Sequence, residues 1–376
     1  MFFFNHRRRE RSFMARLVLQ IMSGYTAIKA DHIFISSADC TAKRYLLLNN
    51  GIIEKISDSL PAHQGRRCLD LTGFVVSPFF CDYHLHFSGS ALAVSDKTSK
   101  ALLQNGINKV CEGGDSRLSG LEMKKLLKDR LEVRTSGYAI YKRGTYGKAI
   151  GEGIDGLREA RGLIDQLRNL GVDYIKIINS GIFKPETGQI TPGGFEREEL
   201  TGIVQYAKEN GLDVFCHANG AGKVHDAVSA GVSAIVHGLY ISEGTLDMMA
   251  ENKIAFIPTA QAFAGLSGLT SEPEIQTRIA KAVEGHLLTI NKAVGRGVMV
   301  LPGSDSGPHF IPYGKAYHKE LELFKKAGLS NEYILSSAVT GQFRAGMQAD
   351  FLVLKGIEIE KIFIRGESLE KRNCPE

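Results

Sequence analysis

The sequence predicts an α/β protein, a (β/α)8 barrel of the TIM type with a small β-sandwich built from both ends of the chain. Three observations predict it. Apolar strand patterns alternate with amphipathic helix patterns through the middle of the 376 residues, both ends show short strands, and histidines recur where the apolar strands end. Near-continuous apolar strands separated by helices are typical of a parallel sheet covered on both faces, and eight such units are typical of a closed barrel.

Composition narrows the function classes. The chain has 43% hydrophobic and 23% charged residues, as ordinary globular proteins do. Its net charge is +5, and the five arginines and one glutamate of residues 1–22 account for +4 of it, so no nucleic-acid surface is indicated. No stretch approaches the ~20 apolar residues of a membrane helix, and we expect no membrane partner and a cytoplasmic location. The six cysteines are scattered without a C-x-x-C pair, so neither a disulfide framework nor a thiolate zinc site is expected.

Both chain ends show β-strand patterns. Residues 1–23 are expected to be a basic, disordered extension, since Arg16 interrupts the apolar run that resembles a signal peptide. Residues 24–77 then give short strands, with Asn49-Asn50-Gly51 as a hairpin turn, and similar patterns return over 339–376. Neither part has enough strands to bury a core alone, so we expect the two to pair into one β-sandwich.

The strand–helix alternation of the predicted barrel covers residues 78–338. The predicted strands are 74–86, 107–111, 133–141, 173–178, 213–217, 233–237, 254–258 and 298–301. The predicted helices are 118–131, 156–169, 196–209, 223–229, 243–251, 274–293 and 315–326. Because connections between parallel strands are right-handed, consecutive units close in one direction around a barrel.

Two histidines end the first of these strands. His84 and His86 are two residues apart, so their side chains point to the same side of the strand, about 6–7 Å apart. Two imidazoles at this spacing can bind one metal ion. A bare His-x-His among eleven histidines is more often an ordinary surface or core pair, so a metal site requires further ligands at the ends of later strands.

Later strands carry four more candidate ligands. Lys176 lies in the fourth strand, His217 and His237 end the fifth and sixth, and Asp305 follows the eighth. In a barrel, the carboxyl ends of the strands meet at one face, so these side chains converge with His84 and His86. Each alone has a structural explanation, such as a hydrogen-bonded core histidine or a turn aspartate. All six at the matching end of their strands favour a metal site.

These stretches resemble the amidohydrolase superfamily, in the branch of imidazolonepropionase-like and prolidase-like enzymes. The similarity extends over roughly residues 30–365. The stretches that carry it are Pro78–His86, Asp173–Ile177, Cys216–Gly220, Ala230–Gly238, Phe256–Thr259, Gly303–Gly307 and Gly346–Phe351.

The sequence departs from the family pattern at three places. Phe79 stands where the family usually has glycine, Val236 stands where many members have glutamate, and the region between Ser337 and Ala345 is short. The first two departures bear on the shape of the pocket, and the third bears on the docking of the sandwich. None of them removes a candidate ligand.

The resemblance implies two divalent ions, with zinc as the expected metal. His84, His86 and Asp305 would bind one ion and His217 and His237 the other, and Lys176, carboxylated by CO2, would bridge them. Burial would lower the pKa of Lys176, as the reaction of a neutral amine with CO2 requires. Metal-activated hydroxide would attack an amide-like C–N bond, and Asp305 would be the catalytic group that carries a proton to the leaving amine.

The expected substrate is a small molecule, namely a dipeptide, an N-acyl amino acid or a cyclic amide. A homo-oligomer is left open.

Three alternatives compete with this interpretation. A mononuclear deaminase of a heterocycle would typically have glutamate where this chain has Gly220, and would have no metal role for Lys176. A non-catalytic relative would have lost metal ligands. A nucleotide-binding fold is suggested by Gly151–Gly156, which matches G-x-G-x-x-G, but the preceding predicted strand ends about ten residues earlier, so we expect a glycine-rich loop at the barrel rim.

Substrate contacts are expected from loops that follow the strands. Tyr141, Arg143 and Tyr146 follow the third strand, and His309 follows Asp305. Phenolic and cationic groups would suit a substrate carboxylate, while a solvated loop explains the same residues equally well. The segment 180–194 is long and contains glycines and prolines, so it could form a lid.

Overall fold

The computed structural model describes residues 25–34, 45–60, 67–87 and 91–369, so the expected basic extension lies outside the described residues. The chain forms two compact units, one containing the residues up to Phe80 and from Asn331 onward, the other Cys81–Ser330. These boundaries differ by a few residues from the predicted 77 and 338, because helix α11 (Asn331–Ala338) groups with the strands of the chain ends.

The unit built from the chain ends contains one seven-stranded sheet, in the order β18-β17-β16-β4-β1-β2-β3. Strand β1 (Tyr25–Ile33) pairs in parallel with β4 (Arg67–Ser77), and β16 (Phe351–Lys355) is antiparallel to β4. The two chain ends therefore pair, although hydrogen bonds join all seven strands in one sheet and a two-layer sandwich stays a prediction. The other strands are β2 (Tyr45–Asn49), β3 (Ile52–Ser57), β17 (Glu358–Ile364) and β18 (Glu367–Leu369).

Both chain ends contribute to the core of this unit. The rings of Phe351 and Phe363 are stacked, with centroids 4.4 Å apart, and they belong to the same buried cluster as Ile28, Leu46 and Val76. Complete burial of one such side chain contributes about 1.5–3 kcal/mol. Strands from either end alone would leave this surface in water, which explains why segments so distant in sequence form one sheet.

The larger unit contains parallel sheets. Strands β5, β6 and β7 form one sheet, and six further strands form another in the order β15-β14-β13-β10-β8-β9. Strand β10 is buried along its whole length, as are β14 and β15, which is typical of parallel strands covered on both faces. Their bounds are β5 (Phe80–Leu85), β6 (Ile107–Glu112), β7 (Glu132–Thr135), β8 (Ala139–Lys142), β9 (Gly151–Ile154), β10 (Tyr174–Ile178), β13 (Asp213–Ala218), β14 (Ala234–His237) and β15 (Ala255–Ile257).

Residues 299–306 connect the two parallel sheets, although the strand predicted at 298–301 is reduced to an isolated bridge at Val300. On one side, Leu301 N donates to Phe256 O over 2.8 Å. On the other side, Tyr83 N donates to Pro302 O over 3.0 Å. The segment therefore lies between β15 and β5, and brings the loop that carries Asp305 to the end of β5.

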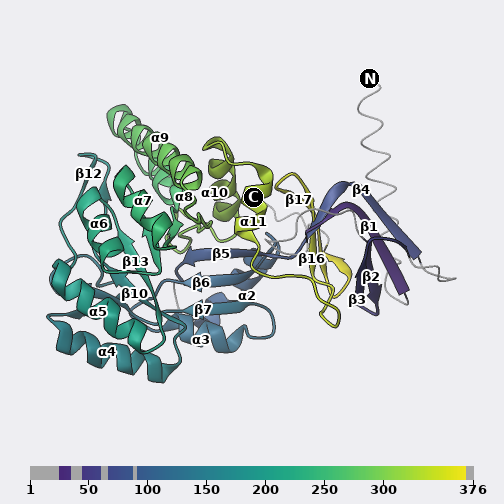
Figure 1. Cartoon of the computed structure of the whole chain (residues 1–376), viewed down its shortest axis with the longest axis horizontal. Coiled ribbons are helices and arrows are strands. Elements are labelled where there is room, and N and C mark those ends of the chain that lie inside the picture. The colour runs from purple at the N-terminus through teal and green to yellow at the C-terminus, as the bar shows by residue number, and fades with distance from the viewer. Residues whose placement is uncertain (1–24, 35–44, 61–66, 88–90, 370–376) are drawn as a thin grey trace. The chain divides into compact units, whose positions relative to one another are not determined.

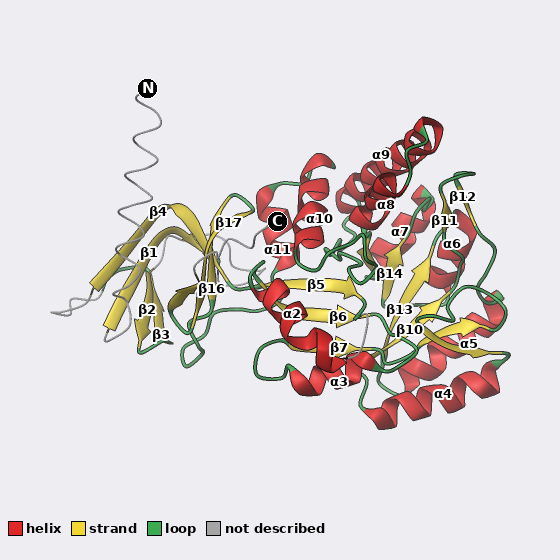
Figure 2. Cartoon of the chain, turned by 180° about the vertical axis from the view of Figure 1, so that it is seen from behind, coloured by secondary structure: helices red, strands yellow, loops and turns green. Residues whose placement is uncertain are grey.

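Helices follow most of the parallel strands, and α4, α5, α6 and α7 succeed one another along one side of the six-stranded sheet (Figures 1 and 2). Helix α4 buries Ala160, Leu163, Ile164 and Leu167, the spacing of an amphipathic helix. Among the described residues, no helix combines the length and the apolar character needed to cross a membrane. The helices are α2 (Ala91–Leu103), α3 (Ser119–Leu126), α4 (Leu157–Leu170), α5 (Arg197–Glu209), α6 (Ala221–Ser229), α7 (Glu243–Glu251), α8 (Ala260–Gly265), α9 (Pro273–Gly295) and α10 (Lys315–Lys326), with a 3-10 helix η1 (Leu266–Leu269).

The structure differs from the sequence predictions near the third strand. The expected strand at 133–141 is divided into β7 and β8, because Gly137 between them has a φ of +69°, which a regular strand does not allow. The expected glycine-rich loop at 151–156 instead begins with strand β9, which pairs in parallel with β8. A side chain at Gly151 would collide with Ala139 O, so glycine serves close strand pairing here. Helices α2, α8 and α11 were not predicted.

Candidate metal centre

A layer of apolar side chains lies beneath the candidate ligands. Tyr174 and Phe215 belong to one buried cluster, together with Val236, Ile257 and Leu301 from neighbouring segments. Side chains two residues apart on a strand share a face. Lys176 and His217, each two residues further along, are therefore carried on top of this layer by β10 and β13.

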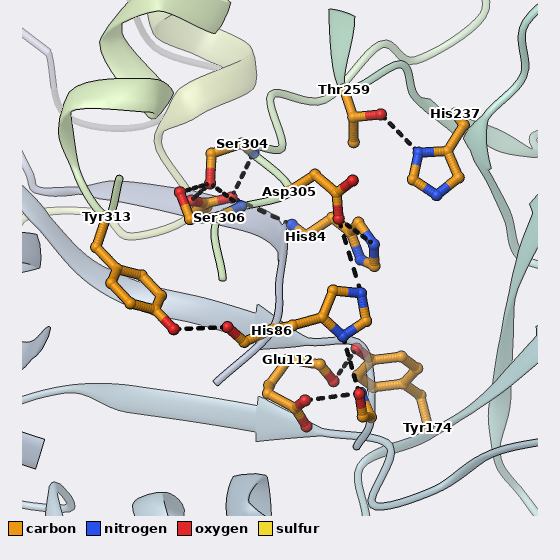
Figure 3. Close-up of polar contacts among 12 residues, drawn as sticks. His84, His86, Glu112, Tyr174, His237, Thr259, Ser304, Asp305, Ser306 and Tyr313 are labelled. Atoms are coloured by element: carbon orange, nitrogen blue, oxygen red, sulfur yellow. Dashed lines mark hydrogen bonds and ion pairs between the residues drawn. The ribbon is translucent and has the colours of Figure 1, made fainter. Parts of the chain in front are cut away.

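The first three ligands meet where β5 ends. Asp305 Oδ1 lies 3.4 Å from His84 Nε2 and 3.7 Å from His86 Nε2, and one ligand atom from each residue falls within 4.8 Å of the others. Figure 3 shows the carboxylate pointing at both imidazoles. We call His84, His86 and Asp305 the first half of the site. Two nitrogens and one oxygen at this spacing are a suitable ligand set for a divalent transition metal.

The remaining histidines continue the cluster. The ring centroid of His237 lies 5.4 Å from that of His84 and 4.5 Å from that of His217. Burial lowers the pKa values of all four histidines, and the positive charge of Lys176, which is itself 1% exposed, lowers them further. Lys176 therefore belongs to the same electrostatic cluster. We call His217, His237 and Lys176 the second half of the site. The structure thus brings together all six residues that the sequence analysis selected.

Hydrogen bonds fix the orientation of three rings. His86 Nδ1 donates to Gly114 O over 2.8 Å, and His217 Nε2 donates to Gly181 O over 3.1 Å. His237 Nδ1 lies 2.7 Å from Thr259 Oγ1 (Figure 3). A neutral imidazole has one N–H, so donating it leaves the other nitrogen with a lone pair for a metal. These contacts would orient the rings for a bound metal ion.

Burial keeps the histidines neutral. It lowers the pKa of His217 to about 4 and the pKa values of His84 and His237 well below their usual range. Burial also lowers the pKa of Lys176 to about 8, and raises the pKa of Asp305 despite the nearby His86 and Lys176. Neutral imidazoles are the form that binds metals.

The buried polar atoms of this cluster fit metal ions. Both ring nitrogens of His84 and the Nζ of Lys176 have no hydrogen-bond partner among the described residues. Leaving such a group unpaired costs about 1–3 kcal/mol, so the arrangement is explained better by bound cations than by a closed polar core. The donor set, four imidazoles and a carboxylate, has the chemistry that zinc and similar ions prefer.

Strained backbone positions coincide with the site. His237, Thr259 and Asp305 have φ values of 72°, 47° and 54°, a left-handed conformation that is uncommon outside glycine. Such residues cluster at functional sites because surrounding contacts hold them there. Position 113 has no room for a side chain, because a Cβ there would lie 2.5 Å from the Cε1 of His84. Only glycine fits.

Two buried carboxyl groups hold the ligand loops and were not selected from the sequence. Asp82 accepts hydrogen bonds from Ser304 N and Ser304 Oγ, next to Asp305, and burial raises its pKa to about 7. Glu112 accepts from Gly114 N, whose own carbonyl accepts from His86. Asp82 could have been found, because Asp82, His84 and His86 form an alternating Asp-x-His-x-His series on one face of β5. Glu112 gives no comparable signal.

The predicted substrate residues lie in different surroundings. The ring centroid of Tyr146 is 5.5 Å from that of His217, whereas Tyr141 packs against Gly147 and Gly153. Arg143 is paired with Asp155 and Glu159 on an exposed surface. His309 is exposed, with its ring centroid 5.5 Å from that of Phe310.

The predicted lid segment contains a short hairpin of β11 (Phe183–Lys184) and β12 (Gln189–Ile190). Gly181, ahead of β11, provides the carbonyl that accepts from His217. The start of the hairpin segment is therefore attached to the site.

Solved structures with the same fold include three hydrolytic proteins. A Xaa-Pro dipeptidase with bound methionine in its active site is 21% identical, with 92% of this chain and 100% of that chain covered and a TM-score of 0.75. Ochratoxinase from A. niger is 20% identical, with 92% and 96% covered and a TM-score of 0.72. Molinate hydrolase is 13% identical, with 93% and 95% covered and a TM-score of 0.71. At these identities the likeness shows the fold alone.

A family model supports the resemblance that the sequence indicated. No curated protein sequence matches the chain. The model of the amidohydrolase family, by contrast, matches residues 75–369, a range that contains all six candidate ligands and the whole of the larger unit. This chain belongs to the amidohydrolase family.

Proposed function

We propose that this protein is a metal-dependent hydrolase that cleaves an amide-like C–N bond of a small molecule, such as a dipeptide, an N-acyl amino acid or a cyclic amide. The observation that carries the proposal is the convergence of the two halves of the site, four neutral histidines around one carboxylate and one buried lysine. The hydrolases of similar fold are consistent with it.

The proposal includes a closed eight-stranded barrel. Residues 299–306 hydrogen-bond to β15 on one side and β5 on the other, and Asp173 N, just ahead of β10, donates to Thr135 O of β7. These contacts would complete a ring of parallel strands whose carboxyl ends carry the six ligands.

The two halves would hold two divalent ions, zinc being the metal expected, the first on His84, His86 and Asp305 and the second on His217 and His237. Lys176 would bridge them after its neutral amine forms an N–C bond to CO2 and releases one proton. The buried, unpartnered Nζ with a pKa of about 8 supports this step, because an appreciable fraction of the amine is neutral near pH 7. Bound ions would lower the pKa of water and polarise the substrate carbonyl.

Asp305 would move the proton. Its carboxylate lies beside both histidines of the first half, and burial raises its pKa, so it can accept a proton from the attacking water and deliver it to the leaving amine. Tyr146, next to His217, would contact the substrate. His309 stays a proposed contact, whereas the ion-paired Arg143 and the packed Tyr141 do not support one.

The test combines metal analysis with a substrate screen. Purified protein, supplied with zinc and bicarbonate, is expected to contain two metal ions per chain and to hydrolyse members of a panel of dipeptides, N-acyl amino acids and cyclic amides. Chelation should abolish this activity, and added zinc should restore it. One ion per chain together with deamination of a heterocycle would replace the proposal with a mononuclear deaminase, and a folded chain that binds no metal would refute it. A cytoplasmic location and a homo-oligomeric state stay predictions.

A further inference from the structure

A buried carboxyl group of α10 binds the backbone directly after Thr259. Glu320 is fully buried, and its two oxygens accept hydrogen bonds from Ala260 N over 3.0 Å and Gln261 N over 2.7 Å. Figures 1 and 2 both show α8 beside α10. The two N–H groups belong to the first turn of α8, where no earlier carbonyl of the helix can pair with them. Glu320 therefore completes the start of α8 from another helix.

Thr259 is the residue from which this capping would be expected. A threonine at the N-cap of a helix usually accepts a hydrogen bond from an N–H of the first turn. Thr259 occupies the N-cap of α8, yet its side chain makes no such bond, and its φ of 47° is left-handed rather than extended. Its hydroxyl lies 2.7 Å from His237 Nδ1 instead (Figure 3). Thr259 thus serves a candidate ligand, and Glu320 has taken over the cap.

The backbone of Thr259 is also held from its other side. His286 of α9 is buried, and its Nε2 donates to Pro258 O, the carbonyl of the preceding residue, over 3.0 Å. The left-handed Thr259 is therefore enclosed between one contact from α9 and another from α10. Such conformations persist only where surrounding contacts fix them, so the position of the Thr259 hydroxyl depends on both neighbours.

The burial of Glu320 is costly. Burial raises its pKa to about 8 although the two N–H bonds lower it, and the negative charges of Asp82 and Asp305 raise it further. An acid in a protein interior is destabilising unless its contacts compensate for the lost water. The compensating contacts are the two N–H groups, and by occupying them Glu320 leaves the Thr259 hydroxyl to His237.

We propose that Glu320 is a positioning residue for the second half of the site, because it caps α8 and so keeps the Thr259 hydroxyl on His237. The inference rests on the proposed function where it treats His237 as a ligand of the second ion. Without the carboxylate, the N–H groups of α8 compete for the Thr259 hydroxyl, and the ring of His237 loses the partner that orients it. None of these hydrogen bonds involves a ligand of the first half, so the first ion should be unaffected.

The test measures the two zinc affinities of Glu320→Gln separately, by titrating chelated full-length protein with zinc against a chromogenic chelator. Glutamine keeps the shape of the side chain and loses one acceptor oxygen. We expect the affinity for the second ion to fall about tenfold, as when an outer-shell contact of a ligand is lost, and the affinity for the first ion to stay the same. Glu322→Gln, the same change at an exposed position of α10, should alter neither affinity. Glu320→Asp keeps a carboxylate, so it should recover part of the loss, and it replaces Glu320→Gln if that variant does not fold.

A double-mutant cycle with Thr259→Val tests the route of the effect. If Glu320 acts through the Thr259 hydroxyl, Glu320→Gln should cause no further loss of the second ion in the Thr259→Val protein. Additive losses, or an equal loss of both ions, would show that Glu320 only stabilises the fold, and would overturn the proposal.

A crystal structure of the metal-free Glu320→Gln protein separates this inference from the proposed function. We expect Thr259 Oγ1 to leave His237 Nδ1 and to approach the N–H groups of the first turn of α8, and an unchanged contact between Thr259 and His237 would overturn the proposal. If the hydroxyl moves but the unsubstituted protein binds no ion at His217 and His237, the proposed function fails and the positioning of His237 by Glu320 stands.

Discussion

The two halves of the metal centre are built differently. In the first half, His84 and His86 come from one strand, and Asp305 brings a carboxylate within 3.7 Å of both rings. In the second half, His217, His237 and Lys176 come from three strands and contribute a cation in place of a carboxylate. The first half includes a carboxylate as folded, whereas the second half would gain a negative charge only through the proposed carboxylation of Lys176. Under the proposed function, the site would therefore depend on a chemical step as well as on folding.

The largest effect is expected for Asp305→Asn in the first half. Asparagine tolerates the positive φ of this position and keeps one oxygen ligand, so the fold should survive while proton transfer is lost. We expect kcat to fall by about 10²–10⁴-fold, the typical contribution of a general acid or base, with metal content nearly unchanged. Steady-state kinetics and elemental analysis test this. The exposed Asp247→Asn is the control, and an Asp305→Asn enzyme with normal kcat would remove Asp305 from the mechanism.

Lys176→Ala tests the second half directly. Loss of the bridging group should release about one of two ions and lower activity on the order of 10²-fold, and formate or acetate should restore part of it by occupying the space of the missing carboxylate. Lys176→Met is the matched control for folding, because an apolar side chain fills the buried position, and it should be inactive without rescue. Full activity and two ions in Lys176→Ala would contradict the bridging role.

A smaller effect is expected when only the orientation of a ligand changes. Thr259→Val removes the hydroxyl next to His237 Nδ1 and preserves shape, so the affinity for the second ion should fall by about 10–100-fold. Competition with a chromogenic chelator measures it. Thr289→Val, whose hydroxyl bonds only the backbone of its own helix, should change nothing. Equal affinities in both variants would mean that Thr259 does not orient the ring.

The smallest effect concerns a buried histidine outside both halves. Burial lowers the pKa of His286 to about 4, so between pH 6.5 and 4 the unfolded chain takes up a proton that the folded chain refuses. The neutral His286 therefore stabilises the folded chain fully above pH 6.5. As the pH falls from 7.5 to 5.5, the free energy of unfolding should decrease by about 1 kcal/mol because of this residue. Urea unfolding should show that His286→Gln, which can still donate to Pro258 O, lacks this part of the pH dependence. An unchanged slope would contradict it.

The difference between the halves also shows which parts of the site could be predicted from the sequence. His84 and His86 could be grouped from local spacing, because strand geometry alone puts them on one face. The association with His217, His237 and Lys176 needed the prediction of a barrel and the family resemblance, since these residues are dispersed along the chain. The strand–helix order was predictable because each apolar strand pattern is bounded by polar turns.

Other features could not be predicted from the sequence. The division of the third strand depends on the φ of Gly137. The need for glycine at position 113 depends on its closeness to the imidazole ring of His84, 29 residues earlier in the chain. Thr259 acts through a hydrogen bond formed across the fold, and Glu112 acts through a local bond to Gly114, whose carbonyl contacts His86 only in the folded chain. Arg143 was expected near substrate, yet its neighbours Asp155 and Glu159 neutralise it, a contact that three-dimensional packing alone decides.

The most direct test of the central claim is anomalous diffraction at the zinc edge from crystals grown with zinc and bicarbonate. The account predicts two peaks about 3.5–4 Å apart, one against His84, His86 and Asp305 and the other against His217 and His237, with electron density for a carboxylate continuing from Lys176 Nζ between them. A single peak, or two peaks with an unmodified lysine pointing away from them, would contradict it.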